Sequence, residues 1–190
     1  SAGPSSCSER SIAGGTGLMN DADFLAGTRS QPLGDAKAGR SADLDALAAY
    51  LASLNTFEPS PYRPSAASLS SAASAGRNVF QAKNCASCHA GTAFTLSSTN
   101  NPRDVGTLKP ASGGRLGGAL TGIDVPTLRD AWATAPYLHD GSAATLDAAV
   151  RAHGNVSVTD AELANLVAYL REIGSDEATA PLPSGSGTGL

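Results

Sequence analysis

The sequence predicts a mostly α-helical protein with long loops, and three observations support this prediction. Apolar residues recur at helical spacing in three segments, near residues 42–54, 70–84 and 159–173. The segment between residues 90 and 125 is rich in Gly, Thr, Ser and Pro and carries little periodicity. At 190 residues with 41% hydrophobic composition, the chain is long enough to bury one good core or two small ones.

The first predicted helix lies in SADLDALAAYLASL, where Ser41 is a suitable N-cap. Its apolar face is formed by four leucines, Leu44, Leu47, Leu51 and Leu54. The run that follows, NTFEPSPYRPSAAS, holds three prolines, which neither continue a helix nor enter a central strand. We therefore expect a linker here and a domain boundary near Pro64.

The second predicted helix, in SSAASAGRNVFQAKN, runs directly into a cysteine motif that begins at Cys85. The last helix begins at the N-cap Thr159, with Glu162 completing a capping box, and extends to Gly174. After it, the tail SDEATAPLPSGSGTGL is rich in Pro, Gly and Ser. Disorder is therefore expected from residue 176.

Charge and hydropathy exclude several classes of function. The net charge is −4 and no Lys/Arg cluster stands out, so nucleic acid is not an expected partner. No segment is apolar for long enough to span a bilayer. The first residues, SAGPSSCSER, lack the order of a signal peptide, so we interpret the chain as mature or truncated. Cys7 has no partner within the chain, which leaves it as a free thiol or for a disulfide between chains.

The chemistry of the chain is concentrated in CASCH, residues 85–89. Two thiols three residues apart on a helical turn project from one face, so Cys85 and Cys88 can both add to the vinyl groups of one porphyrin edge. His89 then reaches the iron, and one covalent haem c is expected. A zinc site is the main alternative, with His139 or His153 as further ligands, but neither stands at a familiar zinc spacing. A thioredoxin-like dithiol lacks its βαβ context.

The helices around this motif resemble those of class I cytochromes c. Gly76 and Phe80, with Leu166 and Tyr169, match the crossed pair of terminal helices, where the glycine permits close approach and aromatic rings fill the contact. Residues 125–154, VPTLRDAWATAPYLHDGSAATLDAAVRAHG, resemble the signature of the bacterial di-haem cytochrome c peroxidase superfamily. The core TAPYLHDG is specific to that group. The expected fold is a class I cytochrome c-like helical domain with long loops, preceded by a partial helical segment.

The resemblance implies three parts. Residues 65–175 correspond to the family's C-terminal, electron-transferring haem domain and form a mono-haem cytochrome c domain. Residues 1–64 resemble the tail of a first cytochrome-like domain plus the Pro-rich linker, because the first and last helices share one spacing of Leu, Leu, Tyr and Leu. Residues 176–190 form the disordered tail. The sequence holds no second Cys-x-x-Cys-His, which departs sharply from the di-haem pattern.

Three residues are candidates for the second axial ligand of the iron. The resemblance favours His153, because the axial methionine of the family's C-terminal haem occupies the matching place after a similar helix. His139, in PYLHDG, is expected to line the haem pocket without binding iron, and Met19 belongs to the first part of the chain. Two strong ligands saturate the iron and suit it to electron transfer, whereas an open position allows peroxide or oxygen chemistry.

Further residues are placed near the haem by the resemblance. Arg129 matches a position near the haem propionates, and a surface salt bridge is the alternative for it. Arg115 is a similar candidate. Tyr137 is expected to wall the porphyrin, as are Phe94, Trp132 and Leu138.

These features predict a c-type cytochrome that passes electrons between redox partner proteins, neighbouring haems or further copies of the chain. The alternative is a fragment or subunit of a di-haem peroxidase-like or oxygenase-like enzyme. The backbone carbonyls of Thr134 and Pro136 match family positions that hold calcium, although a further ligand there comes from a domain with no counterpart in this sequence. Because haem is attached by thioether bonds outside the cytoplasmic membrane, a periplasmic or extracellular location in a bacterium is expected.

Overall fold

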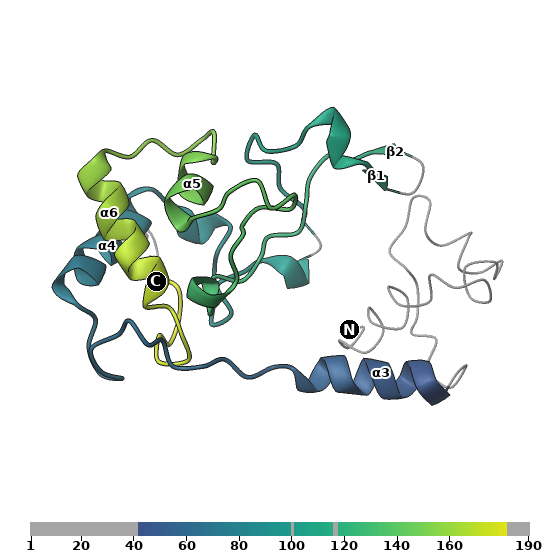
Figure 1. The fold of residues 1–190 in the computed structure, drawn as a ribbon, viewed down its shortest axis with the longest axis horizontal. Coiled ribbons are helices and arrows are strands. Elements are labelled where there is room, and N and C mark those ends of the chain that lie inside the picture. Colours follow the sequence, from purple (N-terminus) through teal and green to yellow (C-terminus); the bar gives the residue numbers. More distant parts are fainter. Residues whose placement is uncertain (1–41, 100, 116–117, 182–190) are drawn as a thin grey trace, which may run out of the picture. The chain divides into compact units, whose positions relative to one another are not determined.

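The computed structural model describes residues 42–99, 101–115 and 118–181. They fall into two compact units, of which the smaller contains helix α3 (Ala42–Ser53) and the larger begins at Phe57 and contains all the other helices. The only strands in the described residues are the paired two-residue segments β1 (Gly114–Arg115) and β2 (Gly118–Ala119). The protein is therefore mostly helical, as predicted (Figure 1).

Helix α3 forms where the leucine spacing predicted it. Ala48 is buried, but Tyr50 and Leu54 are each 60% exposed and Leu51 is 38% exposed. The expected N-cap, Ser41, lies outside the described residues. The predicted helix is confirmed, and much of its predicted apolar face is open.

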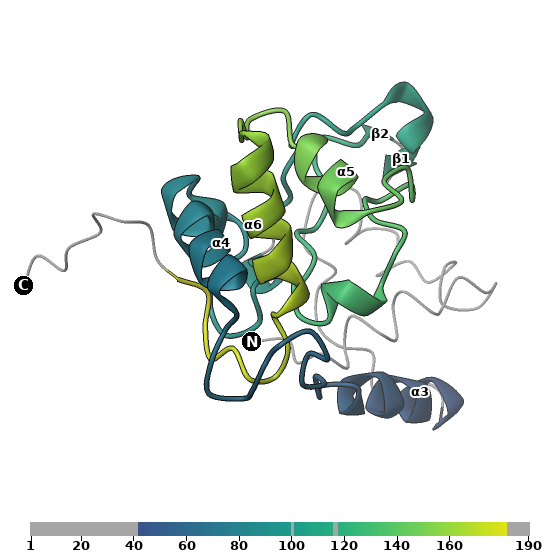
Figure 2. The same ribbon diagram turned by 60° about the vertical axis from the view of Figure 1, so that its left-hand side comes forward.

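The larger unit is built around helix α6 (Asp160–Arg171), which lies between α4 (Ser71–Ala82) and the shorter α5 (Leu146–Arg151) (Figures 1 and 2). The α4 and α6 backbones approach closely at Gly76. A Cβ built there would stand 1.9 Å from the carbonyl oxygen of Asn165 and 2.9 Å from the Cβ of Tyr169. The predicted close approach of two helices at Gly76 is confirmed.

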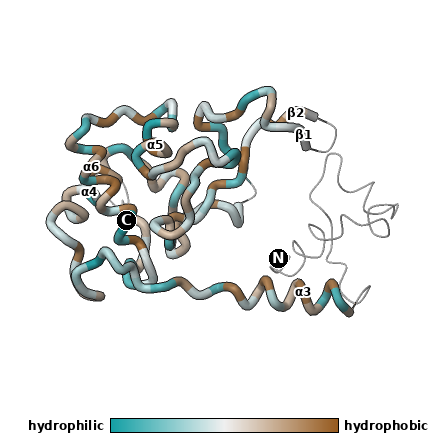
Figure 3. The backbone as a smooth tube through the Cα atoms, in the orientation of Figure 1, coloured by the Kyte–Doolittle hydropathy of each residue, from teal (hydrophilic) through white to brown (hydrophobic). Residues whose placement is uncertain are grey.

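Aromatic rings fill the contact next to this crossing. The Phe80 ring meets the Tyr169 ring edge to face at a centroid distance of 5.6 Å, and the Phe94 ring at 6.4 Å. All three side chains are almost completely buried. Both hydrophobic and hydrophilic stretches colour α6 (Figure 3), and the buried residues of α4 and α6 belong to one hydrophobic core.

Both ends of α6 follow from the sequence. The Thr159 hydroxyl accepts the N–H of Glu162 at 3.2 Å, and the Glu162 carboxylate accepts the N–H of Thr159 at 2.8 Å. This is the predicted capping box. The helix ends at Arg171, slightly before the predicted end at Gly174.

The junction between α4 and the cysteine motif differs from the prediction. Helix α4 ends at Ala82, and Asn84 adopts a left-handed conformation with φ 55°. The cysteines then occupy a separate 3-10 turn, Cys85–Ser87. The predicted continuous helix is interrupted at Asn84, because asparagine tolerates the left-handed conformation that ends one helix before the next turn begins.

The larger unit extends beyond the predicted domain at both ends. Before Pro64, the Ser60 hydroxyl donates to the carbonyl of Arg171 at 2.5 Å, and Arg63 pairs with Glu177 at 2.9 Å. After residue 175, Glu177 and Ala180 are buried. The prediction of disorder from residue 176 is therefore wrong for residues 176–181, because the Glu177 carboxylate has charged partners inside the unit; residues 182–190 lie outside the described part.

Segment 90–125 is mostly irregular, as predicted. It contains two short 3-10 helices, Ser97–Thr99 and Pro110–Ser112, besides the two small strands. A third 3-10 helix, Ala131–Ala133, follows it. Within the described part of the chain, no helix has the length and apolarity required to cross a membrane.

Candidate haem site

The cysteine turn holds both thiols free and half-buried. The backbone N–H groups of Cys88 and His89 both donate to the carbonyl of Cys85, at 3.2 and 2.9 Å. Burial raises the pKa of the Cys85 thiol to about 11. This raised pKa disfavours a thiolate at Cys85 itself.

His89 presents one ring nitrogen to the protein. Its Nδ1 lies 3.1 Å from the carbonyl oxygen of Pro126 and 3.3 Å from that of Phe94. A nitrogen facing two carbonyl oxygens is the protonated one, so Nε2 carries the free lone pair. Burial, followed by the charge of His153, lowers the pKa of His89 to about 4. The imidazole is therefore neutral at neutral pH, the form that binds a metal.

His153 is held in the same manner. It follows α5, and its Nδ1 lies 2.8 Å from the carbonyl oxygen of Ala149, within donating distance. This bond again leaves Nε2 free. After burial, the charge of His153 is the next cause of the lowered pKa of His89.

Of the other two candidates for the axial position, the structure describes only His139. His139 is exposed, and its Nε2 lies 2.8 Å from the hydroxyl oxygen of Ser112. This contact occupies one of the two ring nitrogens of His139. Met19 lies outside the described residues.

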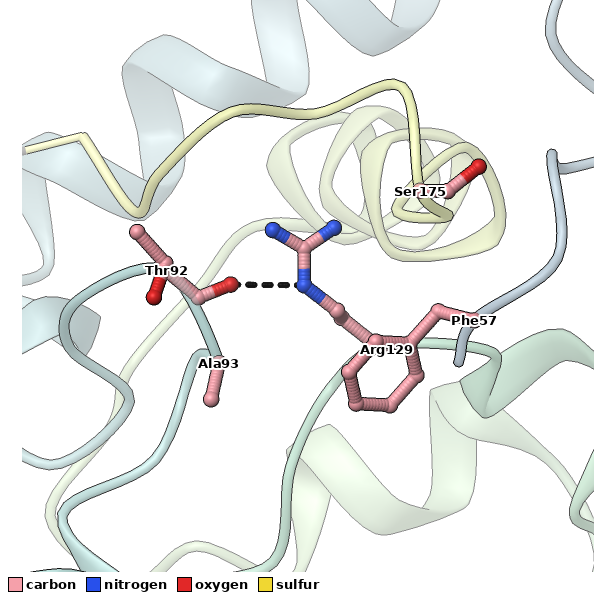
Figure 4. Close-up of a pocket in the computed structure, with 5 residues that line it drawn as sticks. All are labelled: Phe57, Thr92, Ala93, Arg129 and Ser175. Carbon is pink, nitrogen blue, oxygen red and sulfur yellow. Dashed lines mark hydrogen bonds between the residues drawn. The ribbon is translucent and has the colours of Figure 1, made fainter. Parts of the chain in front are cut away.

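Arg129 is buried, with only 8% of its surface exposed, so the surface salt bridge is excluded for it. Its Nε donates to the carbonyl of Thr92 at 2.6 Å, beside a pocket of about 280 Å³ (Figure 4). The other guanidinium nitrogens donate to the carbonyls of Gly174, Glu177 and Ala178. These bonds join separate segments of the chain, and a contact of Arg129 with a haem propionate stays a prediction.

The residues expected to wall the porphyrin have varied surroundings. Phe94 is completely buried, and the Tyr137 hydroxyl donates to the carbonyl of Ala131 at 2.7 Å. The Trp132 ring meets the ring of Tyr62 edge to face at 6.4 Å. The backbone of Leu138 has a positive φ of 69°. The side chain of Arg115 is outside the described part of the structure.

The donor set fits a covalent haem. A porphyrin supplies four of the iron ligands itself, so the protein needs to provide only the axial ones, and His89 and His153 each offer a free Nε2. Among the described residues, Trp132 Nε1, Thr107 Oγ1 and Asp130 Oδ1 are buried without a hydrogen-bond partner. The first two can donate to an acceptor that the polypeptide does not supply, such as a haem propionate, whereas the carboxylate oxygen of Asp130 would need a donor.

The donor set does not fit the zinc alternative. A structural zinc site needs four protein ligands. No group of three or more His, Cys, Asp or Glu side chains gathers for a metal ion anywhere in the part of the chain that the structure describes.

The comparison with known families agrees with this chemistry. The sequence model for cytochrome c matches residues 73–174, just over half of the chain. The chain belongs to the cytochrome c family. Its matched segment begins inside α4 and ends just after α6, so this cytochrome c domain contains the helix pair, the cysteine turn and both histidines.

Two individual proteins are similar to this cytochrome c. Cytochrome c551 peroxidase from Nitrosomonas europaea is 34% identical over 124 residues, which cover 57% of this chain and 36% of the relative. The chain thus spans about a third of that peroxidase, and the predicted resemblance to cytochrome c peroxidases is confirmed. A chain of hydrazine synthase from Kuenenia stuttgartiensis is 26% identical with a TM-score of 0.48, covering 68% of this chain and 54% of that one.

Sequence reasoning did not identify the carbonyl groups that hold the two histidines. Those of Phe94, Pro126 and Ala149 belong to the backbone, so no residue type marks them. Pro126 stands between Val125 and Thr127 in VPT, and only its position opposite His89 in the fold shows what its carbonyl does.

Proposed function

We propose that this cytochrome c binds one haem c through thioether bonds from Cys85 and Cys88, with His89 and His153 as the axial ligands of the iron, and that it transfers electrons. One observation carries the proposal. Each histidine has its Nδ1 within hydrogen-bond distance of a backbone carbonyl, which fixes the ring and leaves Nε2 free.

The haem supplies a one-electron iron couple. Two imidazoles leave no coordination position open on such an iron, and imidazole favours the ferric state more than a thioether does. The protein therefore suits a low-potential electron carrier better than a catalyst that must bind peroxide. Its partners would be redox proteins, haems of neighbouring chains or further copies of itself, in the periplasm or outside the cell of a bacterium.

The second candidate is a part of a di-haem peroxidase-like or oxygenase-like enzyme. The 34% identity to cytochrome c551 peroxidase favours it, since the chain matches 36% of that protein. In that case the present domain would pass electrons to a catalytic haem elsewhere. A calcium ion at the carbonyls of Thr134 and Pro136 belongs to this second proposal, because in the family it lies between two domains.

The haem content and the visible and near-infrared spectra of the purified protein test both proposals. The electron carrier requires one haem per chain by pyridine haemochrome, low-spin in both oxidation states, without a sulfur-to-iron band. More than one haem per chain, or a high-spin fraction, would favour the enzyme.

His153→Met tests the second ligand directly. We expect a higher reduction potential and a new sulfur-to-iron charge-transfer band, because a thioether favours ferrous iron relative to imidazole. His139→Asn is the matched control and should leave both unchanged, since His139 is exposed and contacts Ser112. An unchanged spectrum in His153→Met would eliminate His153 as the ligand.

A further inference from the structure

We propose that Thr127 and Arg129 are positioning residues for His89, which fix the two carbonyl groups that accept its Nδ1–H and thereby set the reduction potential of the haem. The proposal rests on the proposed function, in which His89 binds the iron. It concerns residues that do not need to touch the haem.

Two segments meet at the His89 ring: a proximal loop, residues 91–95, and a facing segment, residues 125–129. Each contributes one acceptor, the carbonyl of Phe94 at 3.3 Å and that of Pro126 at 3.1 Å. The strength of the His89 bond thus depends on how these two stretches of backbone are held together.

Two threonine hydroxyls join the segments on either side of the acceptors. The Thr127 hydroxyl donates to the carbonyl of Ala93 at 2.5 Å. In the reverse direction, the Thr95 hydroxyl donates to the carbonyl of Val125. Each acceptor carbonyl therefore lies between a residue that gives and a residue that receives a cross-segment bond, and neither carbonyl can shift alone.

Arg129 adds a second layer of restraint. Its Nε donates to the carbonyl of Thr92, its backbone N–H donates to the Thr127 hydroxyl at 3.1 Å, and its guanidinium lies 5.3 Å from the centre of the Phe94 ring. The guanidinium also lies 5.4 Å from the centre of the Phe57 ring (Figure 4). The same side chain donates to carbonyls of a C-terminal strap, residues 174–181. The strap also bonds the proximal loop directly, because the N–H of Ala180 donates to the carbonyl of Gly91 at 3.0 Å.

The consequence for the iron has a definite sign. A carbonyl that accepts Nδ1–H increases the basicity of the opposite nitrogen, and a more basic ligand favours ferric iron. Loosening the two acceptors should therefore raise the reduction potential. A direct effect of the Arg129 charge on a propionate would have the opposite sign. Loss of a positive charge near the haem favours ferric iron and would lower the reduction potential.

The test uses the haem-loaded protein and measures its potential by spectroelectrochemical titration. Thr127→Val keeps the shape of the side chain but removes the hydroxyl. Arg129→Lys keeps the charge but cannot donate to all the carbonyls that the guanidinium reaches. At a fixed applied potential, we expect each variant to shift the ratio of reduced to oxidised haem about tenfold toward the reduced form. This corresponds to a rise of about 59 mV in the reduction potential of a one-electron couple.

Two further variants make the result specific. Thr127→Ser restores the hydroxyl and should return the potential of the parent protein. Thr159→Ala removes the N-cap of α6, whose hydroxyl bonds Glu162 and no residue of the two segments at His89, and should lower stability without moving the potential.

The outcomes separate this proposal from the function on which it rests. If the parent protein carries no haem, the proposed function fails. If Thr127→Val carries full haem and its potential is unchanged, or if Arg129→Lys lowers the potential, the positioning role is overturned while the haem assignment stands. Thr127 alone decides the matter if Arg129→Lys does not fold.

Discussion

Replacing Gly76 by Ala should destabilise the protein, although the same change in an isolated helix would stabilise it. The new Cβ would lie 1.9 Å from the carbonyl oxygen and 2.5 Å from the carbonyl carbon of Asn165. Both atoms belong to the backbone of α6, so no side-chain rotation can relieve the contact. Helices α4 and α6 would have to separate by roughly 1 Å or more to reach ordinary van der Waals distances.

Two opposing effects set the magnitude. Alanine is favoured over glycine inside a helix by about 1 kcal/mol. Overpacking of a closely packed contact costs about 3 kcal/mol at the upper end of its usual range, and this contact belongs there because a backbone must move. The expected net loss is therefore about 2 kcal/mol in the free energy of unfolding. The separation would also reduce the contact between the rings of Phe80 and Tyr169.

Urea denaturation of the haem-loaded protein, followed by far-UV circular dichroism, measures this difference. Asn78→Ala is the control, because Asn78 is an exposed position of the same helix and should gain a few tenths of a kcal/mol from helix propensity alone. If Gly76→Ala also stabilises the protein, the close approach of the two helices is not what the glycine provides.

Two further predictions concern buried and exposed charges. Glu177→Gln leaves the Arg63 guanidinium, whose side chain is 7% exposed, without its carboxylate, and should cost about 3 kcal/mol in urea denaturation; an equal loss in Arg151→Gln, whose ion pair is exposed, would contradict this reasoning. The pKa of Glu162 lies below its ordinary value of 4.5 because its carboxylate accepts the N–H of Thr159 and then the ammonium of Lys83. Its contribution to stability is therefore complete above pH 4.5 and lost as the pH falls through the lower folded value, so Glu162→Gln should flatten the acid side of a stability–pH curve.

Local patterns in the sequence were sufficient to predict α3, α4 and α6, whereas α5 and the close approach at Gly76 were expected from the resemblance to cytochromes c. The capping box at Thr159 involves residues three apart, so the sequence alone shows it. The break at Asn84 was missed because helical periodicity continues up to the cysteines, and one left-handed residue does not interrupt it.

The ends of the domain could not be predicted, for a different physical reason. Arg63 and Glu177 stand 114 residues apart, and each lies in a segment whose prolines and small residues favour irregular backbone. Composition correctly indicates that such segments form no helix. Whether they pack depends on a partner at the other end of the chain, which local composition does not show.

In the candidate site, too, some residues could be predicted from the sequence and others depend on the tertiary fold. The spacing of Cys85, Cys88 and His89 predicts a haem-attachment motif, and the resemblance to the peroxidase family makes His153 the favoured candidate for the second ligand. The carbonyls that orient the rings come from loops, and their identity depends on how those loops fold back. The role of Arg129 as a tie between segments is likewise a property of the tertiary fold.

The C-terminal strap, residues 174–181, bonds a loop that is synthesised much earlier in the chain. Ala180 donates its N–H to the carbonyl of Gly91 at 3.0 Å, so the loop beside the haem motif receives one of its bonds from residues synthesised long after it. A chain that emerges from its N-terminus exposes Cys85 and Cys88 well before the strap arrives. The bond between the strap and the proximal loop therefore forms only when nearly the whole domain has been synthesised, which makes the strap the last part of the domain to be fixed.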